Sequence, residues 1–292
     1  MKRAVTIREE LDEIKTVEGL TGIFESIASI KIAKLRNRVI ASKEFFDELW
    51  HTYRGLRVDP KTRLKRPNKT KSDRVVLVAI TSEGKLSGEV DEQVVGEVAT
   101  AYANAKNQDV TDVIVLGAHG AGQLERHGVE VRQVFHVPQG DTQFSVGEII
   151  TALQEYGQIS VFYETYESIR LQRVRRIELV SVVKQLGDEV EDGSEKVEIM
   201  SPKDYIFEPN ANEIADYLES LMLGVALTQV IMESKLAQYA ARFNAMNAAK
   251  RRAKDIGSEY DTMYHRAKRF EGDERLKEIM TVVMNMPGEV LS

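Results

Sequence analysis

A long stretch without proline near the C-terminus limits the possible folds of this chain more than any other feature. Residues 210–286 contain no proline, and a continuous helix of that length would extend on the order of 110 Å, far beyond the usual helix of a compact domain. Apolar or small residues recur there in steps of three and four: Leu236, Ala240, Phe243, Met246, Ala249, Ala253, Ile256, Tyr260, Met263, Ala267 and Phe270. This spacing predicts one seam on one helix face, as in a coiled coil. The frequent alanines predict a slender helix that approaches a neighbour closely.

The N-terminal region carries a second seam with the same spacing, which indicates where that neighbour comes from. Its members are Ile7, Leu11, Ile14, Val17, Leu20, Phe24, Ile27, Ile30 and Leu35, and no proline interrupts the chain before about Tyr53. Two long amphipathic helices at opposite ends of one chain favour pairing as an antiparallel coiled coil. From the pattern alone, both seams are predicted to have this packing role.

The composition limits the classes of protein to be considered. The 292 residues include no cysteine, which excludes a disulfide framework and a thiolate metal site. The first residues lack the apolar core of a signal peptide, and no run approaches eighteen apolar residues, so we expect neither secretion by that route nor a membrane span. A net charge of −6 gives no overall preference for nucleic acid.

A dense basic run separates the first helix from the middle of the chain. Residues 54–74 are rich in lysine and arginine and include Pro60 and Pro67, which predicts an exposed linker. Such a run can also meet the phosphates of nucleic acid or of lipid head groups. No aromatic side chains interleave with the charges as single-strand binding would require, so the solvated linker is favoured.

The middle of the chain has the pattern of an α/β domain. Strands are expected at residues 75–81, 111–117, 131–137 and 158–164, helices at 90–105 and 146–156, an edge or antiparallel strand within 170–183, and an acidic loop at 187–196. Strands that alternate with helices indicate a parallel sheet. The fold class is therefore α/β, a Rossmann-like parallel sheet inserted between two paired helices. The expected divisions are an N-terminal helix (1–56), a basic linker (57–73), the α/β domain (74–204) and a C-terminal helix (205–292).

The motifs of common enzymes are broken or missing in this domain. Residues 79–86 have a Gly-Lys pair, but Ala79 and Leu86 stand where a phosphate loop needs glycine and a hydroxyl. Gly117, Gly120 and Gly122 do not form G-x-G-x-x-G, and we interpret them as turn residues. The five histidines are scattered without metal-ligand spacing, and no G-x-S-x-G occurs. We therefore expect no catalytic residues, no metal and no cofactor in this chain.

Five stretches of the sequence carry a resemblance to a known family. Glu233, Ser234, Ala240, Ala241, Arg242, Ala245 and Met246 resemble the signature E-S-x-x-S-E-H-A-A-R-M-x-A-M of the gamma subunit of F-type ATP synthases, and Tyr264, Arg266, Ala267 and Lys268 resemble its Y-N-R-A-R-Q segment. Thr21, Glu25, Ala28 and Lys31 fit its N-terminal I-T-K-A-M-E-M-V-A-A-S-K run. In the middle, Ser82, Leu86 and Gly88 match the family turn S-D-R-G-L-C-G, and residues 205–209 match Y-x-F-E-P.

This resemblance implies a mechanical part of an enzyme. The chain would be the central-stalk rotor of a proton- or sodium-translocating F-type ATP synthase, carrying torque between the membrane c-ring and the catalytic hexamer. Its partners would be three alpha and three beta subunits around one copy of this chain, the epsilon subunit and the c-ring, without nucleic acid and without direct membrane insertion. It would lie at the cytoplasmic face of the cell membrane as a peripheral protein.

The resemblance also implies which residues contact the hexamer. They are Phe24, Ile27, Lys31, Arg242, Met246, Arg266, Lys268 and Arg269. Lys268 and Arg269 replace the family's R-Q pair, and lysine lacks the planar fork of arginine. The chain thus looks like a divergent, bacterial-type member. The alternative is a free-standing coiled-coil scaffold with an α/β binding module that contacts nucleic acid through the basic linker. A nucleotide-dependent α/β enzyme is a third and weaker hypothesis.

Overall fold

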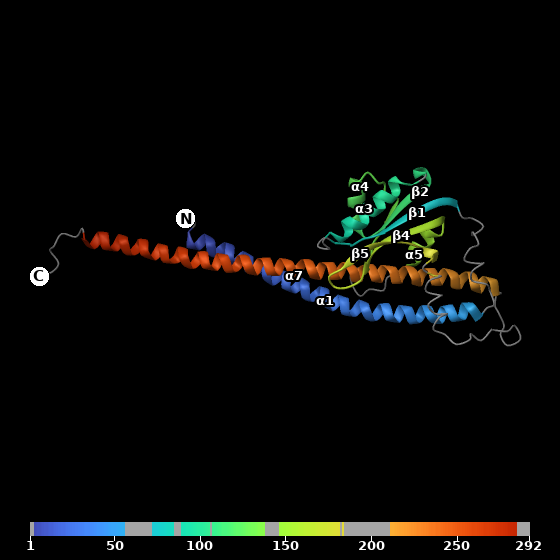
Figure 1. Cartoon of the computed structure of the whole chain (residues 1–292), viewed down its shortest axis with the longest axis horizontal. Coiled ribbons are helices and arrows are strands. Elements are labelled where there is room, and N and C mark those ends of the chain that lie inside the picture. Colours follow the sequence, from blue (N-terminus) through green and yellow to red (C-terminus); the bar gives the residue numbers. More distant parts are fainter. Residues whose placement is uncertain are drawn as a thin grey trace. The chain divides into compact units, whose positions relative to one another are not determined.

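The computed structural model describes residues 3–55, 72–84, 89–105, 107–137, 146–181, 183 and 211–284 (Figure 1). Two helices are very long: α1 (Ala4–Gly55) and α7 (Ala211–Met284). The central domain contains β1 (Ser72–Ile80), α3 (Val90–Ala103), a 3-10 turn η1 (Gln108–Val110), β2 (Thr111–Leu116), α4 (Ala118–Arg126), β3 (Gln133–Phe135), α5 (Gly147–Leu153), β4 (Tyr156–Tyr166) and β5 (Gln172–Glu178). The expected strands and the two long helices are therefore confirmed.

The strands form one sheet in the order β3-β2-β1-β4-β5. β1 pairs in parallel with both β2 and β4, and β2 pairs in parallel with β3. β5 pairs antiparallel with β4, as the alternating sequence of residues 170–183 predicts for an edge strand. From β1 the chain adds β2 and then β3 toward one edge of the sheet. It then crosses back and places β4 on the opposite side of β1. The carboxyl ends of β1 and β4 are thus a topological switch point, where open α/β sheets commonly bind ligands.

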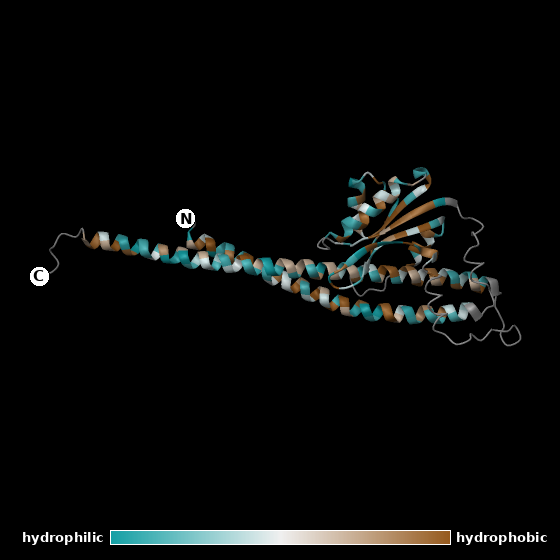
Figure 2. Ribbon diagram, in the orientation of Figure 1, coloured by the Kyte–Doolittle hydropathy of each residue, from teal (hydrophilic) through white to brown (hydrophobic). Residues whose placement is uncertain are grey.

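Both faces of the sheet are covered, which explains its continuous apolar strands. Alternate residues of β1 point to opposite faces, with Val76 and Val78 in one core cluster and Leu77 and Ala79 in the other. Helices α3 and α4 cover one face, while α5 and parts of α1 and α7 cover the other. Figure 2 shows the strands as the brown, hydrophobic layer between these helices.

The chain divides into two compact units, and each is described by itself. The helix-pair unit comprises residues 1–27 and 244–292, and the α/β unit comprises residues 28–243. In both units α1 and α7 pair antiparallel. Ala4 and Ile7 cluster with Ala267 in the helix-pair unit, and Leu35 clusters with Leu236 in the α/β unit. The predicted boundaries at residues 56, 73 and 204 stay predictions, and the basic linker and acidic loop lie mostly or entirely outside the described residues.

The predicted seam on α1 is wrong in its middle. Val17, Leu20, Phe24, Ile27 and Ile30 are between 39% and 57% exposed. The predicted members Ile7, Leu11 and Leu35 are buried, as are Ala4, Thr21 and Ala28, which the prediction left out. Between Leu11 and Leu35 the observed seam therefore uses the small residues Thr21 and Ala28, and bulky apolar side chains there lie outside the contact.

The same error affects the predicted seam on α7. Ala253 and Ala267 are buried, while Ile256, Met263 and Phe270 are exposed. The predicted seam contained both groups, so it is confirmed at these alanines and wrong at Ile256, Met263 and Phe270. The alanines, which predicted a slender helix, mark the true contact.

Helix α4 is a second departure from the sequence-based expectation. Gly117, Gly120 and Gly122 were interpreted as turn residues, but a nine-residue helix begins directly after Gly117. Gly117 adopts φ 107°, a conformation that favours glycine. A Cβ atom on Gly120 would lie 2.4 Å from Cγ2 of Thr81. Gly117 and Gly120 are thus required for the close approach of α4 to the end of β1, while a Cβ atom on Gly122 would meet nothing within 4 Å.

Helix α7 contains an 18-residue window with a mean hydropathy of 1.4. By length and composition alone, this helix could cross a membrane. A core helix of a globular domain passes the same test. Between Ala215 and Ile231, α7 buries apolar side chains in the core of the α/β unit. That packing accounts for apolar residues in this part of the helix, and the expectation of no membrane insertion stays a prediction.

Candidate functional site

An exposed apolar stripe runs along α1 in the helix-pair unit. It consists of Val17, Leu20, Ile23, Phe24 and Ile27, all of them exposed. Their spacing of mostly three residues keeps them near one face of the helix. Contiguous exposed apolar side chains commonly mark an interaction surface. Two of the predicted contact residues, Phe24 and Ile27, belong to this stripe, which we call the α1 outer stripe.

The predicted contact residues near the end of α7 form an exposed basic turn. Arg266, Lys268 and Arg269 are all exposed. Arg269 donates a hydrogen bond from Nε to the carbonyl oxygen of His265 at 3.3 Å, and Nζ of Lys268 lies 6.0 Å from the ring centroid of Tyr264. Apart from these contacts with their own helix, the basic side chains face water. The turn can therefore contact an acidic partner without breaking the fold.

The other predicted contact residues lie in less accessible places. Met246 is 8% exposed and Lys31 is half-buried. The guanidinium of Arg242 lies 5.5 Å over the ring of Tyr239, and its Nε is buried without a hydrogen-bond partner among the described residues. Contacts of these three residues with another subunit stay predictions.

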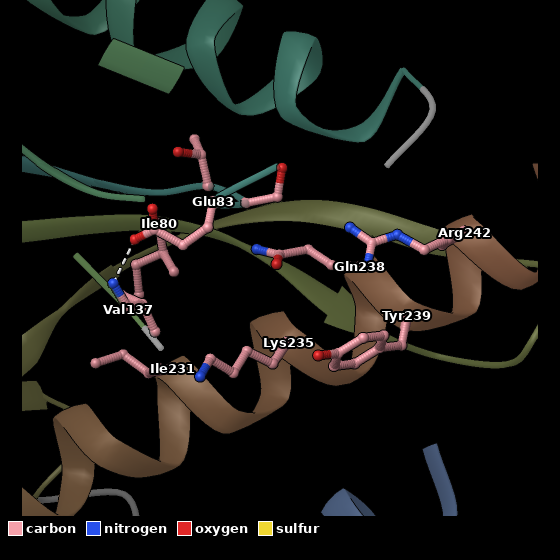
Figure 3. Close-up of a pocket in the computed structure, with 10 residues that line it drawn as sticks. Ile80, Glu83, Val137, Ile231, Lys235, Gln238, Tyr239 and Arg242 are labelled. Carbon is pink, nitrogen blue, oxygen red and sulfur yellow. Dashed lines mark hydrogen bonds between the residues drawn. The ribbon is translucent and has the colours of Figure 1, made fainter. Parts of the chain in front are cut away.

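Arg242 lines a small pocket between α7 and the carboxyl end of β1 (Figure 3). Its lining is Ile80, Thr81, Ser82, Glu83, Val137, Ile231, Lys235, Gln238, Tyr239 and Arg242. The cavity measures about 20 Å³, which holds one or two water molecules but no nucleotide. Burial lowers the pKa of Lys235 to about 8; the carboxylate of Glu83 opposes this shift, and Arg38 adds to it.

The matched residue of the family turn, Ser82, belongs to a buried polar network. Its backbone N–H donates to Oδ1 of Asp91 at 2.9 Å, and its hydroxyl contacts Oδ2 of the same carboxylate. Nδ1 of His119 lies 2.7 Å from that Oδ2 atom. Leu86 and Gly88, the other two matched residues, lie outside the described residues. The network ties the end of β1 to the starts of α3 and α4.

Carboxylates occupy the positions at which doubly wound folds hold phosphate. Glu83 accepts hydrogen bonds from the backbone N–H groups of Val137 and of Ala118, the latter at 3.4 Å in the first turn of α4. Nδ1 of His136 lies 3.2 Å from the same carboxylate. Asp91 stands in the first turn of α3. These acidic groups use the helix N-termini that would otherwise attract an anion, so this switch point disfavours nucleotide phosphates.

Glu164 adds a third carboxylate to this end of the sheet. It is only 2% exposed, and its Oε2 has no hydrogen-bond partner among the described residues. Burial first and the charge of Asp91 second raise its pKa to about 8. Glu164 is therefore largely protonated at neutral pH. The described residues contain no group of three or more His, Asp or Glu side chains that would hold a metal ion.

Another contact missed by the sequence analysis links the sheet to α7. The hydroxyl of Tyr163 on β4 donates to Oε2 of Glu233 at 3.3 Å. Burial raises the pKa of Tyr163 to about 12 and also raises the pKa of Glu233. The glutamate that opens the family signature thus anchors the α/β sheet to the long helix. The two residues are 70 positions apart, so no local pattern signals this pair.

Comparisons of the sequence with known proteins agree with one another. The sequence model of a family described as ATP synthase matches residues 4–283. A curated ATP synthase gamma chain from Verminephrobacter eiseniae is 25% identical over 288 residues, which cover 94% of this chain and 95% of that protein. A chloroplastic ATP synthase gamma chain from Trieres chinensis is 23% identical over 308 residues, which cover 96% of this chain and 83% of that protein.

Solved structures share the fold. A chain in the structure of the Euglena gracilis mitochondrial ATP synthase OSCP/F1/c-ring has a TM-score of 0.59 at 15% identity, with 98% of both chains covered. A chain of the Tetrahymena thermophila mitochondrial ATP synthase central stalk/c-ring has a TM-score of 0.58 at 19% identity, with 79% of this chain and 99% of that chain covered. The family model spans nearly all of this sequence, and the curated relatives are gamma chains. The chain therefore belongs to the ATP synthase gamma-chain family.

Proposed function

We propose that this chain is the central-stalk subunit of an F-type ATP synthase, a rotor that carries torque between a membrane ring and a catalytic hexamer. One observation carries the proposal: two long helices pair antiparallel at the ends of a chain whose middle is an α/β sheet, and the family match runs through all three parts. A mechanical role fits two helices of 52 and 74 residues that pair along their length.

The helix pair has the properties that a rotating shaft requires. Buried alanines such as Ala253 and Ala267 keep the helices close, so the pair is slender enough for a narrow bore. Different faces of the pair carry different chemistry: the α1 outer stripe is apolar, and the turn of residues 266–269 is basic. As the shaft turns, each catalytic subunit meets a different face. Each face then favours a different nucleotide state through its differential contacts.

The contacts with the hexamer are part of the proposal. Phe24 and Ile27 offer exposed apolar surface, and Arg266, Lys268 and Arg269 offer exposed charge. Arg242, Met246 and Lys31 complete the set by family resemblance, although their side chains are partly or largely buried in this chain. Exposed bulky residues on a helix that already has a partner support a further contact.

The assembly that we propose contains three alpha and three beta subunits around one copy of this chain, with an epsilon subunit beside it. The structures with the same fold are named for F1, central stalk and c-ring, which supports the hexamer and the ring as partners. The complex would sit peripherally at the cytoplasmic face of the membrane. Protons or sodium ions would supply about 2.3 kcal/mol per charge for each 100 mV of membrane potential.

Reconstitution with partner subunits tests the function. The purified chain is mixed with alpha and beta subunits from the same source, and the mass of the complex and its ATPase rate are measured with and without this chain. We expect one complex with one copy of this chain per three of each partner, and an ATPase rate that depends on this chain. Absence of a complex, or another stoichiometry, would contradict the proposal.

The scaffold alternative makes a different prediction in a parallel assay. The basic linker on which this alternative depends, residues 57–73, lies largely outside the described residues. The described residues therefore give the scaffold alternative no support. Binding of nucleic acid by the isolated chain, with a steep dependence on salt concentration, would support it. A nucleotide-dependent enzyme would require nucleotide binding by the isolated chain, which the carboxylates at the switch point disfavour.

A further inference from the structure

A polar cluster interrupts the small-residue seam of the helix-pair unit. Nδ2 of Asn247 donates to Oε1 of Glu25 at 2.5 Å, and Nζ of Lys250 donates to Oε2 at 3.0 Å. The Glu25 side chain is 16% exposed, so its carboxylate has exchanged most of its water for these two donors. The hydrogen bonds from Lys250 and then Asn247 hold the pKa of Glu25 below its usual range, although burial opposes them. Glu25 is therefore a charged group held by α7.

Small residues on α1 next to Glu25 leave space for the side chain of Lys250. A Cβ atom on Gly22 would lie 3.7 Å from Cε and Nζ of Lys250, so the lysine side chain lies across the glycine. The hydroxyl of the buried Thr21 donates to carbonyl oxygens of its own helix, at 2.9 Å from both Val17 and Glu18. Thr21 therefore does not hold α1 at one height along α7. At the far end of the unit, the backbone N–H of Ala4 donates to Oε1 of Glu271 at 2.8 Å, so Glu25 is the polar contact on the side of the unit that adjoins residue 28.

Small apolar residues specify register poorly, because one alanine packs much like the next one along the helix. A shift of α7 by one heptad in one direction would place Ala240 and Phe243 opposite Glu25. The carboxylate would then be largely buried without a donor, which is costly. A shift in the other direction would place Lys254 and Gly257 there, so only one of the two donors would be replaced.

We propose that Glu25, through Asn247 and Lys250, is a positioning residue that fixes the axial register of α1 against α7 in the helix-pair unit. A single polar group at a seam position is an established means of fixing register in coiled coils. The inference concerns this chain alone and does not depend on the rotor function. If the chain is a rotor, a fixed register also keeps the two helices from sliding under load.

The chain has no cysteine, so register can be measured with an introduced disulfide. A Cβ atom on Gly257 would lie 3.5 Å from Cγ2 of Ile14, close enough for the pair I14C/G257C to cross-link in the native register. The pair I14C/Y264C reports a shift of one heptad, since these positions are offset by about 10 Å in the native register. The yield of each disulfide is measured in the purified full chain under mild oxidation.

We expect the native pair to cross-link and the shifted pair not to. Lys250→Glu should lower the ratio of native to shifted disulfide about tenfold, because it places like charges together in the native register, whereas the shift that I14C/Y264C reports pairs Glu25 with Lys254. Glu25→Lys meets Lys250 in the native register and Lys254 in the shifted one, so it should lower the ratio by a smaller factor. The double reversal, Glu25→Lys with Lys250→Glu, should restore the ratio to within about twofold. Glu13→Lys, on an exposed part of the same helix, serves as the matched control and should leave the ratio unchanged.

The isosteric Glu25→Gln variant keeps the inference testable if a charge reversal unfolds the unit. It should shift the ratio in the same direction by a smaller factor, with helix content by circular dichroism unchanged. Equal ratios in the parent, Glu25→Gln and both reversals would overturn the inference. A double reversal that fails to recover the ratio while its helices remain formed would also overturn it, since the effect would then not arise from this pair.

Discussion

At the level of single residues, Glu164 links the stability of the α/β unit to pH. Its pKa is raised to about 8 in the folded chain from an ordinary value of 4.5, so between these values the folded chain holds a proton that the unfolded chain has released. The free energy of unfolding should therefore fall as pH rises from about 4.5 to about 8, by on the order of 1 kcal/mol per pH unit, and the contribution should be lost above that range.

The Glu164→Gln variant removes this titration. We expect its stability relative to the parent to increase between pH 5 and pH 8, measured by urea denaturation at each pH. Glu97→Gln, an exposed position on α3, is the control. Its free energy of unfolding should equal that of the parent at both pH values. A stability difference between parent and Glu164→Gln that is the same at pH 5 and pH 8 would contradict the assignment.

Gly117 makes a second prediction at this scale. Its φ of 107° is unfavourable for other residues, and a Cβ atom there would lie 2.1 Å from the carbonyl oxygen of Thr81. Gly117→Ala should lower the free energy of unfolding by about 2–4 kcal/mol. Gly122→Ala is the contrast, because nothing lies within 4 Å of a Cβ atom at that helical position. It should stabilise the chain by about 0.5–1 kcal/mol, and thermal denaturation of both variants measures the difference.

Helices and strands with a strong local sequence pattern could be predicted. Those that form only through packing against distant parts of the chain could not. The run of residues 75–81 is almost entirely apolar and mostly β-branched, so β1 is evident from its sequence. Helix α4 is short and contains Gly120 and Gly122, which locally favour a turn. Gly117 and Gly120 let this helix approach the end of β1, and that requirement depends on a strand far away in the sequence.

The seams of α1 and α7 show the same limit in another form. Periodicity predicts that a helix has an apolar face, but these helices have two such faces in the helix-pair unit. One is buried and holds mostly small residues beside Ile7 and Leu11, and the other is made of bulky residues and is exposed. Only the distance between the helices decides which face is the contact. That distance is set by packing, which no single helix sequence contains.

A pair of substitutions on α7 tests which face is the contact. Ala253 is buried, so Ala253→Leu should overpack the seam and lower the stability of the helix-pair unit by about 1–3 kcal/mol. Ile256 is exposed, so Ile256→Ala should change stability by less than about 0.5 kcal/mol. Helix content followed by circular dichroism during heating measures both effects. The reverse order of effects would show that Ile256, and not Ala253, lies in the contact.

For the whole molecule, the candidate contact surface could be predicted only through the family resemblance. The resemblance gave Phe24 and Ile27 as contacts, while the periodic pattern assigned the same residues to the seam between the helices. The two interpretations exclude each other for a given side chain. Their exposure in the structure is compatible with the first and contradicts the second.

The Phe24→Lys variant separates a contact with partner subunits from a role in folding. Because Phe24 is 39% exposed, the isolated chain should keep its helix content and lose less than about 1 kcal/mol of stability. In the reconstituted complex, a lysine on the α1 outer stripe would place a charge against the apolar surface that we propose it meets, so ATP turnover coupled to ion movement should fall severalfold. Ile40→Lys is the matched control: Ile40 is an exposed apolar residue of α1 outside that stripe, and coupling should remain near the parent value. Normal coupling in Phe24→Lys, or an equal loss in Ile40→Lys, would show that the stripe is not the surface through which torque passes.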